Sequence, residues 1–417
     1  MTELIHVRQT CRLCESPRLV RSLKLAEVPI VSPNVATEED TLGQRLTRIV
    51  APIDNYLCQD CGLNQLLHVV DPSLIYRDYL YRTSVSLGLP EHFDALAKAV
   101  IARAQLRDGE LVCEFGSNDG TLLGAFKAGR MSVQGVDPAK QIAAEASSRG
   151  IPTLPEFFTE ALAERIRADR GAARAVVANN AMANIDDLTG ILAGVRALLA
   201  PDGVFVFETQ YALDVFEKTL LDVIYHEHIS TFSVWPVVEA FSRHGLTVFD
   251  AERIATKGGS IRFWCQLAGG PNPVTPQVAE LISLEKRTGL YDLAYHQRFG
   301  DKVARITAEL HERIAAVRSC GGRVGAYGTS VGCAALIHQF RLEDKLDVLF
   351  DDTPFKDRLE GPGYSLPVMR SDHIYQLKPD MIILLAWRYA SVIIHKHIEY
   401  SETGGVFVIP LPDVVTS

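Results

Sequence analysis

Short apolar runs alternate with longer amphipathic stretches through the middle of the chain. Short apolar runs bounded by turn residues are typical of strands, and apolar residues at helical spacing are typical of helices. The alternation predicts an α/β fold with a parallel sheet. The predicted strands cover 110–115, 132–137, 173–177, 204–208 and 261–267. The predicted helices cover 91–107, a segment from Thr121, 140–149 and 188–199.

A second set of apolar runs follows near the C-terminus. A proline-rich break at 271–276 leads into a polar helical stretch, 278–318, which predicts a connecting helix. Further apolar runs then predict a second α/β sheet, with strands at 346–350, 381–385 and 405–409 and a helix at 334–340. These breaks divide the chain into predicted domains of 1–75, 76–270 and 271–417.

The turn after the first predicted strand of the middle domain carries the strongest binding signal. It places Glu114, Gly116, Asn118 and Gly120 between a strand and a helix, and the next strand ends at Asp137. Ligands of doubly wound sheets bind beside such turns, and a carboxylate after the second strand suits a ribose diol. The glycines do not form G-x-G-x-x-G, so S-adenosylmethionine (SAM) fits better than a dinucleotide. An ordinary βα turn is the alternative.

Two pairs of cysteines stand near the N-terminus, each with the C-x-x-C spacing. Four thiolates match the tetrahedral coordination of zinc, and the two-residue spacer lets both sulfurs of a pair face one ion. A closed set of four protein ligands predicts a structural zinc rather than a catalytic one, with a redox dithiol as the alternative. The proposed ligands are Cys11, Cys14, Cys58 and Cys61.

Composition narrows the class of protein. Of 417 residues, 47% are hydrophobic and 22% charged, as in a globular protein with sizeable cores. A net charge of −9 argues against a nucleic-acid partner. No apolar run reaches the ~20 residues of a membrane span, and the first residues lack a signal-peptide pattern. We therefore expect a cytoplasmic protein without a membrane partner, whose eight cysteines are not a disulfide framework.

Polar residues at the ends of later strands add candidate chemistry. Asn179 and Asn180 follow a predicted strand and face the expected ligand edge, although such residues also favour plain turns. Residues 225–228 read Tyr-His-Glu-His, which is the strongest catalytic candidate. Histidine suits proton transfer near neutral pH, and a neighbouring carboxylate can orient it. A chance polar cluster on a loop is the alternative.

The C-terminal unit opens with a second glycine-containing turn, at 323–333. A strand, such a turn and a helix N-terminus together favour an anion, because free N–H groups point at the ligand. A plain βα turn explains this segment equally well.

With these blocks in order, the chain resembles the C-methyltransferases of deoxysugar biosynthesis, which act on nucleotide-linked 4-keto sugars. The resemblance covers nearly the full length. It implies an α/β protein with a small zinc-binding N-terminal module, a SAM-dependent Rossmann-like methyltransferase domain and a second Rossmann-like domain at the C-terminus. The motifs that carry it are the cysteine pairs, the 79–86 loop, 114–120, 225–228, 258–260, Tyr327-Gly328, and the spacing of Pro354, Lys356, Pro362 and Gly363.

The resemblance also implies roles for individual residues. His228 is expected to remove a proton next to the keto group, giving an enolate that attacks the SAM methyl group, while Glu227 and Tyr225 orient the base or bind the keto oxygen. The expected cofactor-binding residues are Glu114, Gly116, Asn118, Gly120, Asp137, Asn179 and Asn180. The expected substrate-binding residues are Tyr79, Tyr81, His226, Lys257, Tyr327, Thr329, Ser330 and Lys356.

The expected substrate is a CDP- or dTDP-linked 4-keto deoxysugar, and a monomer is one expectation for a chain whose oligomeric state is open. This sequence departs from the family at three positions. Asn184 stands where the family has histidine, Lys257 where it often has histidine, and Gly332 near a usual lysine or arginine. An O- or N-methyltransferase acting on a related sugar, or a non-catalytic sugar-nucleotide or SAM-binding protein, is therefore the alternative.

Overall fold

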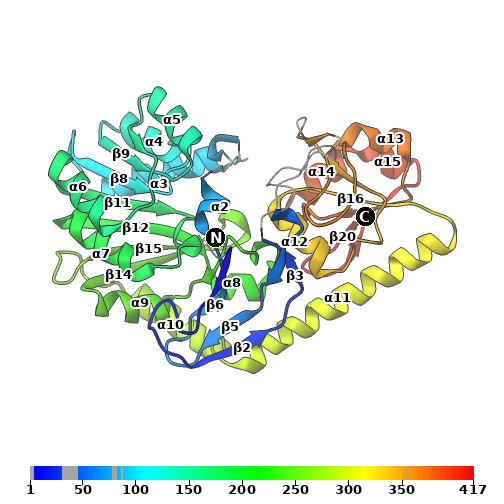
Figure 1. Ribbon diagram of the computed structural model, residues 1–417, viewed down its shortest axis with the longest axis horizontal. Helices are drawn as coiled ribbons and strands as arrows, with labels where there is room; N and C mark the ends of the chain where they lie inside the picture. Colours follow the sequence, from blue (N-terminus) through cyan, green and yellow to red (C-terminus); the bar gives the residue numbers. More distant parts are fainter. Residues whose placement is uncertain (1–3, 31–45, 78–81, 86–87, 354–355, 358) are drawn as a thin grey trace.

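The computed structural model describes residues 4–30, 46–77, 82–85, 88–353, 356–357 and 359–417. Its largest sheet has the strand order β10-β9-β8-β11-β12-β15-β14 (Figure 1). The strands from β10 to β12 are parallel, which confirms the predicted α/β class, and β15 and β14 add an antiparallel edge. The strands are β8 (Leu111–Phe115), β9 (Ser132–Val136), β10 (Thr153–Leu154), β11 (Ala173–Asn179), β12 (Leu199–Gln210), β14 (Leu246–Ile254) and β15 (Ser260–Leu267).

Helices cover both faces of this sheet. Successive strand residues point to opposite faces, so Val112 of β8 joins one hydrophobic cluster while Cys113 and Phe115 join the other. Because both faces are buried, the strands read as nearly continuous apolar runs. One face packs on α3 (Leu89–Arg103), α4 (Thr121–Ala128) and α5 (Lys140–Ser148), and the other on α6 (Glu160–Arg170), α7 (Leu188–Leu198) and α9 (Val234–Arg243).

The cysteine-bearing segment folds into short strands that lie against the middle domain. Its sheet has the order β13-β6-β5-β2, formed by β2 (Leu19–Leu23), β5 (Asn55–Cys58), β6 (Asn64–Leu66) and β13 (Ser230–Thr231). Strand β13 lies far along the chain, so this sheet crosses the predicted domain boundary at residue 75. Two antiparallel ribbons complete the segment: β1 (Ile5–Val7) with β7 (His68–Val70), and β3 (Glu27–Pro29) with β4 (Val50–Pro52).

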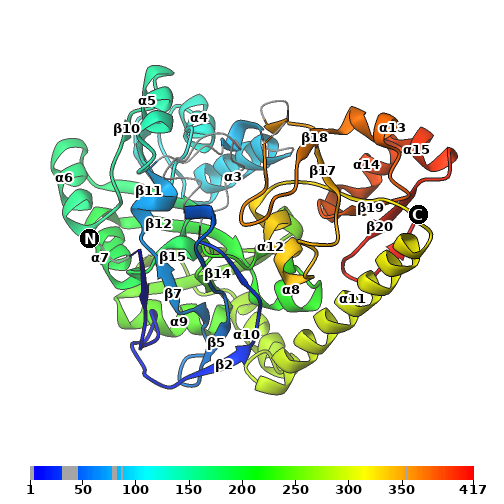
Figure 2. The same ribbon diagram turned by 45° about the vertical axis from the view of Figure 1, so that its right-hand side comes forward.

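Two helices connect the middle and C-terminal parts of the chain. The predicted single helix over 278–318 is instead α10 (Pro276–Thr288) and α11 (Leu293–Ser319). Gly289 ends α10 with a φ of 78°, a left-handed conformation that glycine adopts without strain. Helix α11 extends from the region of β2 and β5 to the C-terminal domain (Figures 1 and 2). Among the described residues, no helix is both long and apolar enough to cross a membrane.

The C-terminal domain contains the second predicted sheet. Its strand order is β18-β17-β16-β19-β20-β21, with all neighbours parallel except β21. Helix α12 (Val331–Gln339) follows β16 as the sequence indicates. The strands are β16 (Val324–Tyr327), β17 (Val348–Asp351), β18 (Val368–Arg370), β19 (Met381–Leu384), β20 (Val406–Ile409) and β21 (Val415–Thr416).

The start of α12 packs tightly on the 3₁₀ turn η3 (Leu221–Val223) of the middle domain. A Cβ atom added to Gly332 would lie 2.4 Å from the backbone oxygen of Asp222. Beside this contact, Arg388 of the C-terminal domain pairs with Asp222 at 2.8 Å and donates to the backbone oxygen of Lys257 at 3.0 Å. The absence of a side chain at Gly332 therefore has a packing reason, because backbone from another domain occupies that space.

Replacing Gly332 by alanine is expected to loosen this interface. The added methyl group forces backbone to shift, and overpacking of this kind costs about 1–3 kcal/mol. We therefore expect a lower melting temperature for Gly332→Ala in thermal unfolding. Gly124→Ala in α4 is the matched control, because nothing lies within 4 Å of its added Cβ and alanine favours helices. Equal melting temperatures of the Gly332→Ala variant and the wild type would contradict the packing argument.

Candidate active site

The turn after β8 has the backbone shape of a ligand-binding loop. Gly116 has a φ of 67°, and Asn118 has a φ of 48°. A Cβ atom on Gly116 would lie 2.7 Å from the Cβ of Ala181, so both conformation and space require glycine there. Gly120 also has a positive φ, of 76°, and caps the N-terminus of α4. The turn therefore packs closely on Ala181, just after β11, at the carboxyl edge of the sheet.

Asp137 fixes this turn from the neighbouring strand. Its carboxylate accepts the backbone N–H of Asn118 at 2.8 Å and that of Ala139 at 2.9 Å. Burial raises the pKa of Asp137, and these two hydrogen bonds oppose the rise. Each carboxylate oxygen accepts more than one hydrogen bond, so the group can also accept from ligand hydroxyls.

A short segment of the 79–86 loop lies over the turn. The backbone N–H of Thr83 donates to Oδ1 of Asn118 at 2.9 Å, and that of Ser84 donates to a carboxylate oxygen of Asp119 at 3.1 Å. The predicted substrate residues Tyr79 and Tyr81 lie outside the described residues. Their roles stay predictions.

Two buried polar atoms of the turn have no hydrogen-bond partner within the described residues. They are Oε2 of Glu114 and Oγ of Ser117. Burial raises the pKa of Glu114 well above its ordinary value, and the charges of Asp137 and Asp119 raise it further. Buried polar atoms normally have partners, so these two atoms are available to hydrogen-bond a bound molecule.

Asn179 ends β11 and contacts a charged network, and Asn180 follows it. Nδ2 of Asn179 donates to Oε2 of Glu208 at 2.7 Å, and Asn180 donates to the side chain of Asn179. Glu208 also contacts His92 at 2.7 Å and Arg262 at 2.6 Å. The predicted cofactor residues therefore lie at the expected edge, with the Asn179 amide held by Glu208.

His228 has a single defined tautomer. Its Nδ1 lies 2.8 Å from the backbone oxygen of Val223, which can only accept, so the proton is on Nδ1 and Nε2 carries the free lone pair. The hydroxyl of Tyr225 lies 3.2 Å from Nε2, and the amide nitrogen of Gln210 lies 3.3 Å from it. The same Gln210 nitrogen lies 3.3 Å from Nδ1, so the amide at the end of β12 contacts the imidazole ring as a whole.

The surroundings keep His228 uncharged. Burial lowers the pKa of His228 to about 4, and the nearby charge of Lys257 lowers it further, against the bond to Val223. The pKa of Lys257 is shifted as well. Desolvation and the charge of Arg388 lower this pKa to about 8, while the charge of Glu227 raises it. Lys257 has a φ of 53°, a costly backbone conformation for lysine. His228, Lys257 and Glu227 therefore form one electrostatic group.

Tyr76 contacts the backbone of this group, and the sequence patterns did not single it out. Its hydroxyl donates to the backbone oxygen of Glu227 at 3.2 Å. Burial raises its pKa well above its usual range, the charges of Glu227 and Tyr225 add to the rise, and a hydrogen bond with Asn184 opposes it. Asn184 therefore stands beside the candidate base loop. Gln210 was also missed, although it ends an apolar strand at the predicted ligand edge.

His226 lies apart from His228. Its Nε2 is 3.2 Å from the backbone oxygen of Ala51 and 3.3 Å from that of Val28, both in the β3–β4 ribbon. Burial lowers the pKa of His226 to about 4. The structure therefore places this ring against the N-terminal segment, and its predicted contact with substrate stays untested.

The C-terminal residues predicted to bind substrate are brought together at the end of β16. The backbone N–H of Thr329 donates to Asp351 at 3.0 Å, and the Lys356 ammonium donates to the Thr329 hydroxyl at 3.0 Å. The Ser330 hydroxyl caps α12, and Tyr327 is buried at the end of the strand. Their contact with a substrate stays a prediction.

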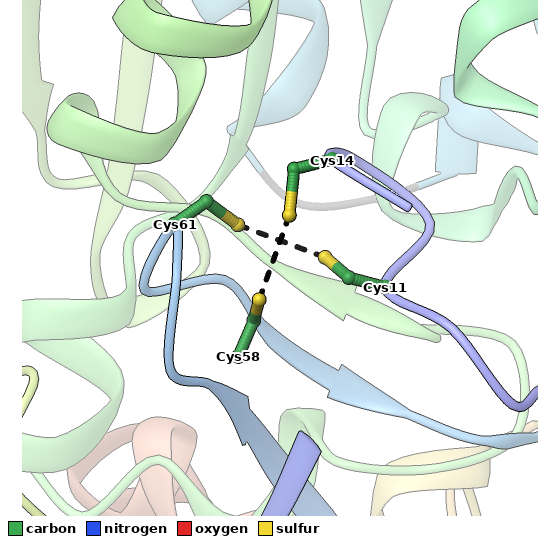
Figure 3. Close-up of side chains that lie close together, drawn as sticks. All are labelled: Cys11, Cys14, Cys58 and Cys61. Carbon is green, nitrogen blue, oxygen red and sulfur yellow. Dashed lines mark hydrogen bonds between the residues drawn. The ribbon is translucent and has the colours of Figure 1, made fainter. Parts of the chain in front are cut away.

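The four N-terminal cysteines form a metal centre. Their sulfurs lie within 4.8 Å of one another and point at a common centre (Figure 3). The Cys11–Cys61 and Cys14–Cys58 sulfur pairs are each 3.6 Å apart. A tetrahedral zinc with bonds of about 2.3 Å to sulfur requires sulfur separations close to these. The donor set and its spacing thus fit zinc, with no position left for a substrate.

Three family descriptions match successive segments of the chain. A zinc binding domain matches residues 11–76, a methyltransferase domain matches 90–251, and a C-methyltransferase C-terminal domain matches 255–412. The C-methyltransferase NovU of Streptomyces niveus is 33% identical over 414 residues, which make up 99% of this chain and 98% of that protein. The chain belongs to the C-methyltransferase family. It is a SAM-dependent methyltransferase with a structural zinc site.

Solved methyltransferases resemble part of this C-methyltransferase more distantly. The magnesium protoporphyrin IX methyltransferase ChlM of Synechocystis PCC 6803, solved with bound SAH, is 13% identical and matches 43% of this chain and 83% of that chain, with a TM-score of 0.34. The N-methyltransferase NodS of Bradyrhizobium japonicum WM9 is 11% identical over 43% of this chain and 95% of that chain, with a TM-score of 0.32.

The residues around the β8 turn fit SAM. SAM carries an ammonium group and ribose hydroxyls, which are donors, and this region offers acceptor oxygens on Asp137, Glu114 and Ser117. Asp137 stands at the end of the second strand, where a carboxylate suits a ribose diol. These residues would hold the cofactor, which supplies the methyl group.

Replacing Asp137 by alanine is expected to weaken SAM binding. The change removes the carboxylate proposed to accept the ribose hydroxyls, and a hydrogen bond to a charged group contributes about 1.5–3 kcal/mol. It also removes the acceptor of the Asn118 N–H. We expect a 10- to 100-fold higher Kd for SAM by titration calorimetry. Asp94→Ala, on the exposed face of α3, is the control. An unchanged Kd in folded Asp137→Ala would contradict the assignment.

Proposed function

We propose that this C-methyltransferase methylates a carbon next to the keto group of a nucleotide-linked 4-keto deoxysugar, through an enolate. The observation that carries the proposal is the state of His228. Its Nδ1–H is held by Val223, and its unprotonated Nε2 lies beside the Tyr225 hydroxyl at 3.2 Å. A neutral imidazole with an unprotonated Nε2 is the group needed to accept a proton from carbon.

Residues of this chain account for the proton transfer and the charge stabilisation in the proposed reaction. Nε2 of His228 accepts the proton from the carbon beside the keto group, and the electrons of that C–H bond form the enolate. Tyr225 or Lys257 stabilises the charge that develops on the keto oxygen, since donors aimed at developing charge lower the barrier. SAM supplies the methyl group, and its sulfur keeps the electron pair of the broken bond. His228 then releases its proton to solvent.

The C-terminal domain is the proposed site of the nucleotide part of the substrate. Supporting this, Lys356, Thr329 and Ser330 gather at the end of β16 and the start of α12. A helix N-terminus and an ammonium both favour phosphate oxygens. Gly332 has no side chain that could bind phosphate, and backbone of η3 fills the space beside it.

Mass spectrometry in deuterated water tests the proposal. The protein is incubated with SAM and a panel of CDP- and dTDP-linked 4-keto deoxysugars, and with the sugars alone. We expect a product one methyl group heavier, together with deuterium entering next to the keto group when SAM is omitted. A methylated product that retains the neighbouring hydrogen would exclude carbon as the acceptor. No product across the panel would refute this substrate class.

A further inference from the structure

Arg12, between the two cysteines of the first zinc pair, has a fully buried side chain. A buried charge is costly unless it is paired and hydrogen-bonded. Here the guanidinium donates from Nη1 to the backbone oxygen of Ile229 at 2.6 Å and from Nη2 to that of Leu66 at 2.7 Å. Its Nε donates to the carboxylate of Asp186 at 3.2 Å. The contacts on Ile229 and Leu66 are shorter than the common distance for N–H···O bonds.

The contact with Ile229 reaches the residue next to the candidate base. The same Ile229 oxygen also accepts the backbone N–H of Leu66 at 2.9 Å. Immediately afterwards, β13 pairs with β6, with Ser230 opposite Gln65. Residues that follow His228 are thus built into the sheet of the zinc-binding module, and Arg12 closes the end of that pairing.

The contact with Asp186 reaches a second loop of the site. Asp186 stands two residues after Asn184, whose amide hydrogen-bonds the Tyr76 phenol. Arg8 pairs with the same carboxylate at 3.1 Å and donates to the backbone oxygen of Asp186 at 3.3 Å, but its side chain is partly exposed. One buried cation therefore connects the zinc knuckle to both loops that surround the candidate base.

We propose that Arg12 is a positioning residue, which holds the 225–229 loop in register so that His228 faces the substrate. The proposal rests on the proposed function of His228. It explains why arginine stands here, because the planar guanidinium donates in several directions at once, to two carbonyls and a carboxylate, whereas a lysine ammonium is a point charge on a flexible stem. It also gives the zinc site a role in the chemistry without contact with the substrate.

Arg12→Met and Arg8→Met form a matched pair of variants. Both remove an arginine that contacts Asp186, but only the first removes the donor to Ile229. Zinc content, SAM affinity, and amide hydrogen exchange by mass spectrometry over 222–231 are measured in the full chain. For Arg12→Met we expect one zinc per chain, a SAM Kd within twofold of wild type, and at least tenfold faster exchange over 222–231. For Arg8→Met we expect exchange within threefold of wild type.

Turnover provides the second readout, because small displacements of a reacting group can lower a rate about 10²-fold. We expect kcat to fall 10- to 100-fold in Arg12→Met with KM within threefold, and deuterium entry into the keto sugar to fall in the same proportion. A role confined to stability would lower the melting temperature and leave kcat of the folded protein and the exchange over 222–231 unchanged, which would overturn the proposal.

Arg12→Lys keeps the test decisive if Arg12→Met does not fold. Lysine preserves the cation for Asp186 but cannot bond both carbonyls in the guanidinium geometry, so the same loss of loop protection is expected. Wild-type exchange and kcat in Arg12→Lys would overturn the proposal. Hydrogen exchange needs no substrate, so it tests the role of Arg12 even when no keto sugar is turned over. Absence of turnover refutes only the proposed substrate.

Discussion

His228→Asn is expected to lower kcat by about 10²–10⁴-fold, the usual contribution of a general base, while the Kd for SAM stays within twofold of wild type. Asparagine removes Nε2, the atom that lies beside the Tyr225 hydroxyl. It leaves the β8 turn and Asp137 intact. Single-turnover methyl transfer and titration calorimetry measure the two quantities separately.

His395→Asn is the control for this variant, because His395 is exposed on α14 (Ala390–Lys396). Wild-type turnover in His228→Asn would refute the assignment of the base. A large loss of SAM affinity would instead place His228 in the cofactor site.

The pKa of His228, lowered to about 4, also predicts how kcat and stability depend on pH. Above that pH the ring is neutral in the folded protein, so this ionisation does not limit kcat at pH 6 to 8. Stability changes with pH in the same sense as for a paired carboxylate, because the folded pKa is lowered in both cases. The folded ring binds its proton at a lower pH than an unfolded histidine, so the neutral buried ring costs stability as pH falls from about 6.5 toward 4. His226 adds a second such group.

Removal of zinc is expected to unfold the N-terminal module and to abolish turnover together with it. Structural zinc contributes about 10–16 kcal/mol of folding free energy in small zinc-finger peptides at neutral pH. The module's sheet includes β13, so its loss also frees the residues that follow His228. A chelator titration followed by hydrogen exchange should show loss of protection in β2, β5, β6 and β13 at the same zinc occupancy at which turnover is lost. SAM affinity should change less than threefold.

Cys58→Ser combined with Cys61→Ser should reproduce this loss in the absence of chelator. Cys320→Ser is the control, since Cys320 is exposed and lies far along the chain at the end of α11. Selective loss of turnover with an intact module would point to a catalytic metal. Full turnover of the zinc-free protein would refute the link between the module and the catalytic loop.

The strand and helix pattern of the middle and C-terminal domains was predictable because these strands are buried on both faces. Apolar runs such as 110–115 therefore stand out, and the turn after β8 was recognised from Gly116 and Gly120. The break between α10 and α11 was missed, since Gly289 alone interrupts an otherwise continuous helical pattern. Strand β12 starts at Leu199 rather than 204, because Leu199 already pairs with Ala173 of β11, before a register shift that leads to the pairing of Ala175 with Val204.

The amino-acid sequence by itself determined the zinc ligands, the glycine-containing turn after β8 and the Tyr-His-Glu-His motif, because each is a local spacing of particular residues. Only the tertiary structure decided which of them act together. It separated His226 from His228, brought Gln210 to the candidate base and Tyr76 to the neighbouring Glu227, and showed the backbone beside Gly332. Gln210 and His228 are 18 positions apart, and the other contacts join residues more than a hundred positions apart. Tertiary packing fixes all of them, and no local pattern of residues records it.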